Sequence, residues 1–241
     1  MILGVSHIVL GSTNLSRDRS VLESYGWKTL FEEPNIPTFP GKRPFMSTKS
    51  NKQTMAFLLP AQGIPVELIH YSDIIPDSSP SPLKICLPSS HSASETGLFT
   101  CDLEFSSSAP LPSLVTHFVT DLEKAETFWT KGLGFRRTSR QDVPPETLEL
   151  EFLSPVPHWR ITLLLSLRKG VSTPNLLDGN GYRCLSFVCA DLDRVRPNLI
   201  TAGARRSSGC IDLKVNGKML QLELFAGPDG VMIELFKTLK S

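Results

Sequence analysis

Three ionisable side chains lie within apolar, strand-like segments of the sequence. His7 is in SHIVLG, Glu67 is in PVELIHY and Glu234 is in VMIELF. Imidazole and carboxylate groups can bind a metal ion, act as a general base, or hydrogen-bond within a protein core. Because an unpaired buried carboxylate is costly, each glutamate needs a cation, a hydrogen-bond donor or a wet pocket. The residue types leave these three explanations open.

Strand alternation predicts where these side chains point, since successive residues of a strand face opposite sides of a sheet. Ile8 and Leu10 are expected on one face of the first strand, where they can cover a helix. The residues expected on the cavity faces of the three strands are Val5, His7 and Val9; Glu67 and Ile69; and Met232, Glu234 and Phe236. We therefore expect three ionisable groups among apolar neighbours.

The remaining candidate residues favour structural roles. His117 lies four residues before a helix cap and is expected to face the helix, while His70 alternates away from Glu67. No GxSxG motif is present, and no local motif ties a cysteine to a histidine base. The sequences GKR (41–43) and DGNG (178–181) lack the strand–loop–helix context of a phosphate loop and are predicted to be turns.

One pattern of elements occurs three times along the chain. Each copy has an apolar strand, a capping Asn or Asp, a short helix that begins with Leu, and further strands. The predicted N-caps are Asn14, Asp121 and Asp191, and the glycines expected just after the helices are Gly26, Gly134 and Gly203. The helices are predicted over 15–25, 122–131 and 192–203, and three strand-like runs follow each of them.

Length and composition indicate a soluble, globular protein. The chain has 241 residues, 40% of them hydrophobic, and a net charge of +1, which disfavours binding to nucleic acid or to an anionic membrane. No apolar stretch is long enough to span a membrane, and no signal sequence is evident. Five cysteines without a CxxC pair favour a reducing, cytoplasmic location over a disulfide scaffold or a zinc ribbon.

The repeated units resemble modules of the vicinal-oxygen-chelate superfamily, which includes glyoxalase I, bleomycin-resistance proteins and extradiol dioxygenases. The resemblance is most specific in GPDGVMIELF, IPVELIHY and SHIVL. It implies an α+β fold of βαβββ modules, with curved mixed sheets around a cavity and helices on the outside. The predicted domains are module 1 (1–72), a Ser/Pro-rich linker with a possible extra strand (73–112), module 2 (113–169) and module 3 (183–241).

The resemblance also implies positions for metal ligands on the first and last strands of each module. The first-strand positions in the three copies are His7, Leu114 and Cys184, and the last-strand positions are Glu67, Thr162 and Glu234. The second copy lacks both ligands. Cys184 departs from the usual ligand types and is expected to pack as a buried thiol. The implied metal set is therefore His7, Glu67 and Glu234.

Two functions follow from this resemblance. The preferred one is a metal-dependent isomerase, epimerase or lyase acting on a small molecule with vicinal oxygens. Its metal would be divalent Fe, Mn, Zn, Ni or Co, and Glu67 or Glu234 would be the catalytic base. The alternative is a metal-free protein that binds or sequesters a small molecule. An extradiol dioxygenase is less favoured, because the second histidine of its facial triad is missing.

The pairing of the three copies is open at this level. The short connection over 170–182 favours local pairing of copies two and three. Copy one would then need a degenerate fourth unit around GLFTCDLEF, or the same copy in a second subunit of a homodimer. In another arrangement, copies one and three pair across the linker and bring His7, Glu67, Cys184 and Glu234 together.

Overall fold

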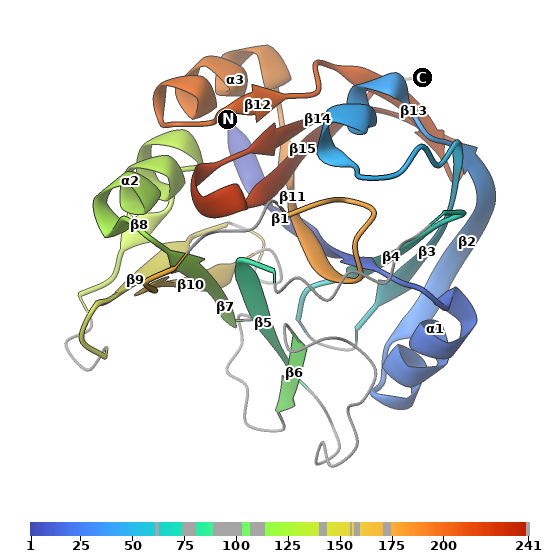
Figure 1. The fold of residues 1–241 in the computed structure, drawn as a ribbon, viewed down its shortest axis with the longest axis horizontal. Coiled ribbons are helices and arrows are strands. Elements are labelled where there is room, and N and C mark those ends of the chain that lie inside the picture. The colour runs from blue at the N-terminus through green and yellow to red at the C-terminus, as the bar shows by residue number, and fades with distance from the viewer. Residues whose placement is uncertain are drawn as a thin grey trace.

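The computed structural model describes residues 1–60, 63–73, 81–88, 103–106, 114–139, 144–154, 156, 160–170 and 175–239 (Figure 1). Copy one contains β1 (Ile2–Gly11), α1 (Leu15–Ser24), β2 (Lys28–Pro37), the 3-10 helix η1 (Pro40–Phe45), β3 (Lys52–Leu59) and β4 (Val66–Tyr71). Copy two contains β7 (Leu114–Val119), α2 (Leu122–Thr127), the π-helix η2 (Phe128–Gly132), β8 (Arg136–Arg137), β9 (Thr147–Phe152) and β10 (Ile161–Leu167). Copy three contains β11 (Gly181–Cys189), α3 (Leu192–Thr201), β12 (Arg206–Ser207), β13 (Ile211–Val215), β14 (Lys218–Ala226), the 3-10 helix η4 (Pro228–Gly230) and β15 (Met232–Thr238). Between copies one and two lie β5 (Leu83–Pro88) and β6 (Leu103–Ser106).

The helices begin and end as their sequences predict. The side chains of Asn14, Asp121 and Asp191 each accept a hydrogen bond from a backbone N–H of the first helical turn, at 3.0 Å. These bonds satisfy donors that have no partner within the helix. The glycines after the three helices, Gly26, Gly134 and Gly203, have φ angles of 95°, 84° and 111°. None of the helices in the described ranges is long and apolar enough to cross a membrane.

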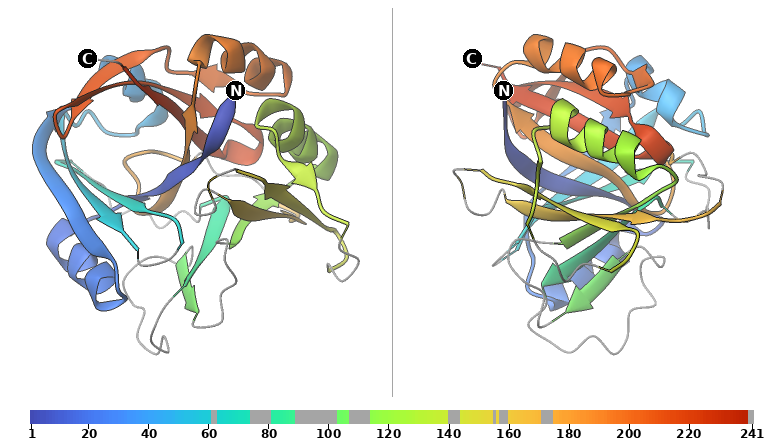
Figure 2. Two further views of the ribbon diagram at one scale, coloured as in Figure 1. Left: turned by 180° about the vertical axis from the view of Figure 1, so that it is seen from behind. Right: turned by 90° about the vertical axis from the view of Figure 1, so that its left-hand side faces the viewer.

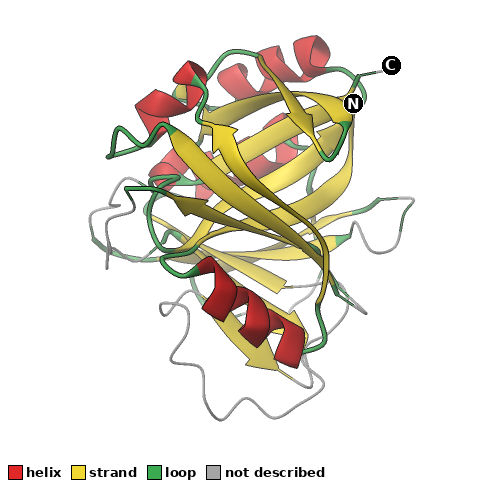
Figure 3. Cartoon of the chain, turned by 90° about the vertical axis from the view of Figure 1, so that its right-hand side faces the viewer, coloured by secondary structure: helices red, strands yellow, loops and turns green. Residues whose placement is uncertain are grey.

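The described strands form two mixed sheets. The larger sheet has nine strands in the order β12-β14-β15-β11-β1-β4-β3-β2, with β13 beside β14, and the smaller has six in the order β6-β5-β7-β10-β9-β8. The larger sheet curls into a nearly closed wall (Figure 2). The helices lie on the outside of the strands (Figure 3). The predicted α+β class with curved mixed sheets is confirmed.

Copies one and three pair directly, as the third proposed arrangement requires. Strand β1 runs antiparallel to β11, with His7 opposite Ser186 and Val9 opposite Cys184. Copies two and three do not share a sheet, so the prediction that they pair locally is wrong at the level of strands. They meet through their helices, where Gly132 lies against Leu199 and Ala202 of the α3 region.

Copy two is completed by strands from the segment that was predicted to be a linker. Strand β5 pairs antiparallel with β7, and β6 pairs parallel with β5. Strand β6 overlaps the last three residues of the predicted strand GLFTCDLEF and extends one residue past it, whereas β5 was not predicted. The rest of this segment, at 74–80, 89–102 and 107–113, lies outside the described residues.

Two apolar clusters occupy opposite faces of the larger sheet. The first contains Ile8 and Leu10 of β1, and it continues through Trp129, Phe135 and Phe152 of copy two, so both sheets share this core. The second contains Val9, Ile69 and Cys184 and lies on the concave face. A functional site on the concave face is therefore built by copies one and three alone.

A β-bulge alters the predicted alternation at the start of β1. The register of β1 against β11 shifts between Val5 and His7. Val5 consequently packs in the shared core with Ile8, whereas Val9 lies on the concave face. The expectation that Val5 shares the face of His7 is wrong, because a bulge inserts an extra residue and reverses the alternation.

Candidate functional site

Adjacent strands at the centre of the larger sheet carry the predicted site residues. In the strand order β15-β11-β1-β4, Glu234 lies beside Ser186, Ser186 lies opposite His7, and Glu67 lies beside Val9. As predicted, Glu67 and Glu234 have apolar neighbours from their own strands on the concave face. These neighbours are Ile69, Met232 and Phe236.

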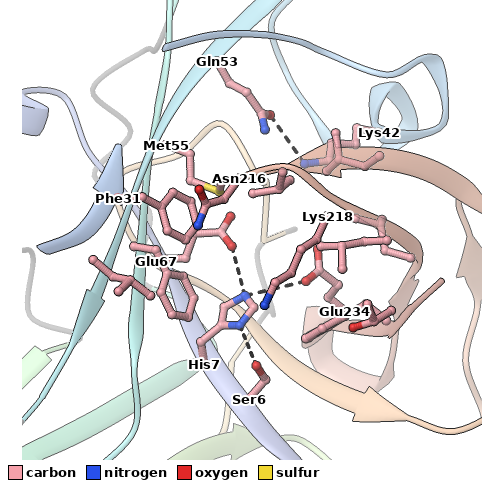
Figure 4. A pocket seen from close by; sticks show the side chains of 18 residues that line it. Ser6, His7, Phe31, Lys42, Gln53, Met55, Glu67, Asn216, Lys218 and Glu234 are labelled. Atoms are coloured by element: carbon pink, nitrogen blue, oxygen red, sulfur yellow. Dashed lines mark hydrogen bonds and ion pairs between the residues drawn. The ribbon is translucent and has the colours of Figure 1, made fainter. Parts of the chain in front are cut away.

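The side chains of His7, Glu67 and Glu234 converge on one point of the concave face (Figure 4). His7 Nε2 lies 3.1 Å from Glu67 Oε2 and 3.7 Å from Glu234 Oε1. His7 Nδ1 lies 3.0 Å from the Ser6 hydroxyl, and Ser186 Oγ donates to Glu234 Oε1 at 2.8 Å. His7 and Glu234 are 227 positions apart in the sequence, so the fold brings together residues from distant parts of the chain. All of them belong to one chain.

Burial and mutual charge set the pKa values of the three groups. Burial alone would lower the pKa of His7, but the adjacent Glu67 and Glu234 carboxylates outweigh it and raise that pKa. Burial would raise the pKa of Glu67, yet His7 and then Lys42 lower it overall. The pKa of Glu234 is raised by burial and by Glu67. The site without a metal therefore favours an imidazolium paired with the Glu67 carboxylate.

The three residues lie at the wall of a cavity of about 280 Å³. The ring of His7 contacts Phe57 at 5.3 Å between centroids, and Phe57 stacks on Phe31 at 5.6 Å with an angle of 6° between planes. The backbone N–H of Asn216, at the tip of the β13–β14 hairpin, donates to Glu33 of β2 at 2.8 Å. This contact joins the two ends of the curled sheet. The cavity is thus small, largely apolar and enclosed by a single chain.

The donor types of these three residues suit a divalent metal ion. Two ligand atoms in adjacent positions on one ion, with bonds of about 2.0–2.2 Å, lie about 3.0–3.5 Å apart. The distances from His7 Nε2 to the two carboxylates are close to this range. His7 Nε2 is also buried without an aligned hydrogen-bond partner in the described part of the chain. Across the same residues, no group of three or more His, Cys, Asp or Glu side chains is arranged to hold a metal ion, so the side chains of the three candidates would have to move to bind one.

The other positions implied by the resemblance contribute no ligand to this cavity. Cys184 lies on the concave face but is buried and is not part of the described cavity lining, and burial, followed by the charges of Glu234 and Glu67, raises its thiol pKa well above the ordinary value. Leu114 and Thr162 are register partners in the smaller sheet. The site therefore has three candidate ligands.

The two other described histidines have structural contacts. His117 is fully buried, and its Nδ1 accepts a hydrogen bond from Trp129 Nε1 at 3.1 Å. Burial lowers the pKa of His117 from 6.5 to about 4, so the ring is neutral at physiological pH. His70 Nδ1 bonds to the backbone oxygen of Ser12 at 2.9 Å. His117 faces the helix as the alternation predicts.

Two polar residues of the site were missed in the sequence. Ser186 shares its strand face with Cys184, so alternation along CLSFVC could have indicated it. Lys42 lies on η1 in the segment predicted to be a turn, and it lines the cavity together with Gln53. No local pattern identifies Lys42, because its approach to the cavity depends on how η1 folds back over the sheet.

Comparisons with known proteins agree with this architecture. Glyoxalase I from Zea mays is similar over 97% of this chain and 92% of its own, with 18% identity and a TM-score of 0.62. A variant of that enzyme gives a TM-score of 0.65 at 18% identity over the same shares of both chains. A candidate dioxygenase from Bacillus subtilis is similar over 100% of this chain and 86% of its own, with 8% identity and a TM-score of 0.57. At these identities the likeness shows a shared fold.

Sequence comparison identifies the family. No curated protein has a sequence that matches this chain. The family model described as the Glyoxalase/Bleomycin resistance protein/Dioxygenase superfamily matches residues 113–235, which is just over half of the sequence. The chain therefore belongs to the Glyoxalase/Bleomycin resistance protein/Dioxygenase superfamily.

Proposed function

We propose that the protein is a metal-dependent isomerase, epimerase or lyase acting on a small molecule with vicinal oxygens. The observation that supports this most is the buried Nε2 of His7, which lacks an aligned hydrogen-bond partner among the described residues and faces two carboxylates at a cavity wall. Imidazole and carboxylate ligands suit divalent Fe, Mn, Zn, Ni or Co. His7, Glu67 and Glu234 would hold the ion, which would polarise adjacent oxygens of a substrate.

Glu67 is the better placed of the two carboxylates to act as general base. Glu234 is held by Ser186 as well as by His7, whereas the carboxylate of Glu67 has His7 as its one close partner in the described structure. A base must reach a substrate proton, and a carboxylate with fewer anchors can turn towards it at lower cost. Glu234 would then remain in place and keep the site assembled.

Metal content of purified protein tests this function. We expect about one transition metal ion per chain in the wild type after growth in supplemented medium, and loss of that ion in His7→Ala. His70→Gln is the matched control, because His70 bonds to the backbone of Ser12 and does not line the cavity. A wild-type protein without metal would refute the enzyme proposal, and equal metal in His7→Ala would refute the site.

A metal-free binding protein is the second candidate. It is supported by the ion pair of His7 with Glu67, which compensates both charges without a metal, and by the aromatic wall of Phe31 and Phe57. This function predicts that an aromatic ligand binds equally well before and after treatment with EDTA. A strict requirement for metal in ligand binding would contradict it.

The proposal also covers the cellular location and the binding partners of the protein. A reducing cytoplasm is supported by the thiols of Cys184, Cys189 and Cys210, none of which is in a disulfide. The partner would be a small molecule, since the charge balance favours neither nucleic acid nor an anionic membrane. A homodimer is not needed to complete the cavity, because copies one and three of the same chain build it.

A further inference from the structure

A buried lysine lines the same cavity as the three candidate ligands. Lys42 lies in the 3-10 helix η1, and only 4% of the residue is exposed. Figure 4 shows its ammonium beside Gln53, on the side of the cavity opposite His7 in that view. Lysine is almost never so fully buried unless it is paired. The position therefore requires an explanation.

The partners of Lys42 do not balance its charge. An ammonium group has three donors, and Lys42 Nζ makes one long hydrogen bond, 3.4 Å, to the neutral side chain of Gln53. No carboxylate in the described ranges lies within ion-pair distance of it, although its charge lowers the pKa values of Glu67 and Glu234. The charge of Lys42 therefore acts on both glutamates, and its ammonium group retains hydrogen-bond donors for another group.

The formal charges of the cavity leave room for one anion. Among the largely buried side chains of the cavity, Glu67 and Glu234 contribute two negative charges and Lys42 contributes one positive charge, with His7 neutral as a ligand must be. Lys218, the other cation of the lining, is exposed and screened by solvent, so it is left out of this sum. A divalent ion brings the sum to +1. Because an uncompensated buried charge is strongly unfavourable, a ligand with a single negative charge would make the filled cavity neutral.

The rest of the cavity lining indicates the size and polarity of the remainder of that ligand. Half of the 18 residues that line the cavity are apolar or aromatic. They include Phe31, Met55, Phe57, Leu222 and Phe236. The volume of about 280 Å³ is at the small end of ligand sites, which run from about 300 to 1,000 Å³. These walls suit a compact apolar or aromatic group.

We propose that the cavity takes a small monoanion with an aromatic or apolar body, and that Lys42, with Gln53 beside it, binds the anionic group. The inference rests on the small-molecule function proposed above and adds the substrate class. Lys42 is a specificity-determining residue in this account. The neutral oxygens of the ligand would face His7, Glu67 and Glu234.

A matched pair of probes tests this inference. The probes are 3-phenylpropionate and 3-phenylpropionamide, which have nearly the same shape and differ in charge. Binding is measured by calorimetry to the Zn²⁺-loaded wild type, Lys42→Met and Lys214→Met, with metal content and melting temperature determined for the same samples. Lys214 is the control, since it is an exposed lysine of β13 that does not line the cavity.

We expect the wild type and Lys214→Met to bind the acid at least tenfold more tightly than the amide. Lys42→Met should retain its metal and bind the two probes with nearly equal affinity. Lys42→Gln is a second variant for the same comparison should Lys42→Met fail to fold. No preference for the acid in the wild type overturns the inference, as does a preference that survives in folded Lys42 variants or disappears in Lys214→Met.

The same measurements separate this inference from the proposed enzymatic function. Bound metal without preference for the acid refutes the role of Lys42 and leaves the metal site standing. A preference that depends on Lys42 in a protein that takes up no metal supports the role of Lys42 and refutes the metal-dependent enzyme. Neither metal nor preference refutes both.

Discussion

His117 should make the stability of the protein fall steeply on acidification. Its ring is fully buried against Trp129, and burial lowers its pKa from 6.5 to about 4, despite the opposing charge of Asp229. Between these two pH values the unfolded chain binds a proton that the folded protein does not bind. Stability contributed by neutral His117 is therefore complete above pH 6.5 and is lost as the pH falls towards 4. A difference of 2.5 units corresponds to about 3 kcal/mol.

The test compares the wild type with His117→Gln, whose amide oxygen can still accept from Trp129 but does not titrate. Urea unfolding at pH 7.5 and pH 4.5 gives the free energy of unfolding of each protein at both values. We expect the wild type to lose about 2.5 kcal/mol more than the variant over this interval. Comparing the two losses cancels the contribution of all other groups. Equal losses would refute a buried, neutral His117.

Three further substitutions test the site and its supports. Ser186→Ala removes a hydrogen-bond donor to Glu234. Mutating a residue that hydrogen-bonds to a metal ligand typically weakens metal binding by about 10- to 100-fold. We therefore expect metal titration to show about tenfold weaker binding, with little change in melting temperature. Gly11→Ala would place a Cβ atom 1.8 Å from the carbonyl oxygen of Gly179. Chemical denaturation should therefore show a loss of about 3 kcal/mol in the free energy of unfolding. An unchanged unfolding midpoint would contradict this close approach. Asp178→Asn replaces a carboxylate that accepts hydrogen bonds from the backbone N–H groups of Ser47 and Thr48 with a neutral amide. We expect the same assay to show a loss of about 2 kcal/mol in the free energy of unfolding. A loss below about 0.5 kcal/mol would contradict this expectation.

Local signals in the sequence predicted the helices well. Asn14, Asp121 and Asp191 cap helices because a short acceptor side chain satisfies nearby backbone donors, and that chemistry depends on a few adjacent residues. Strand pairing depends on distant segments, so the contact of β1 with β11 could be proposed only as one of several arrangements. Strand β5 escaped prediction because LKICLP is short and lies in a Ser/Pro-rich segment.

The candidate site could be predicted from the sequence in part. His7, Glu67 and Glu234 lie where the resemblance to the superfamily implies metal ligands, and strand alternation independently placed them on the cavity face. The face of Val5 was predicted wrongly, because alternation along one strand carries no information about a bulge that arises from pairing with another. Lys42 was overlooked, since its burial results from the folding of η1 over a cavity that the local sequence does not encode.

The central claim is that one metal ion is held by His7, Glu67 and Glu234. A crystal of the metal-loaded protein, measured on both sides of the absorption edge of that metal, tests the claim most directly. We predict a single strong anomalous peak within about 2.0–2.3 Å of His7 Nε2 and of one oxygen from each glutamate. A peak elsewhere, or a metal-loaded crystal without a peak beside His7, would contradict the account.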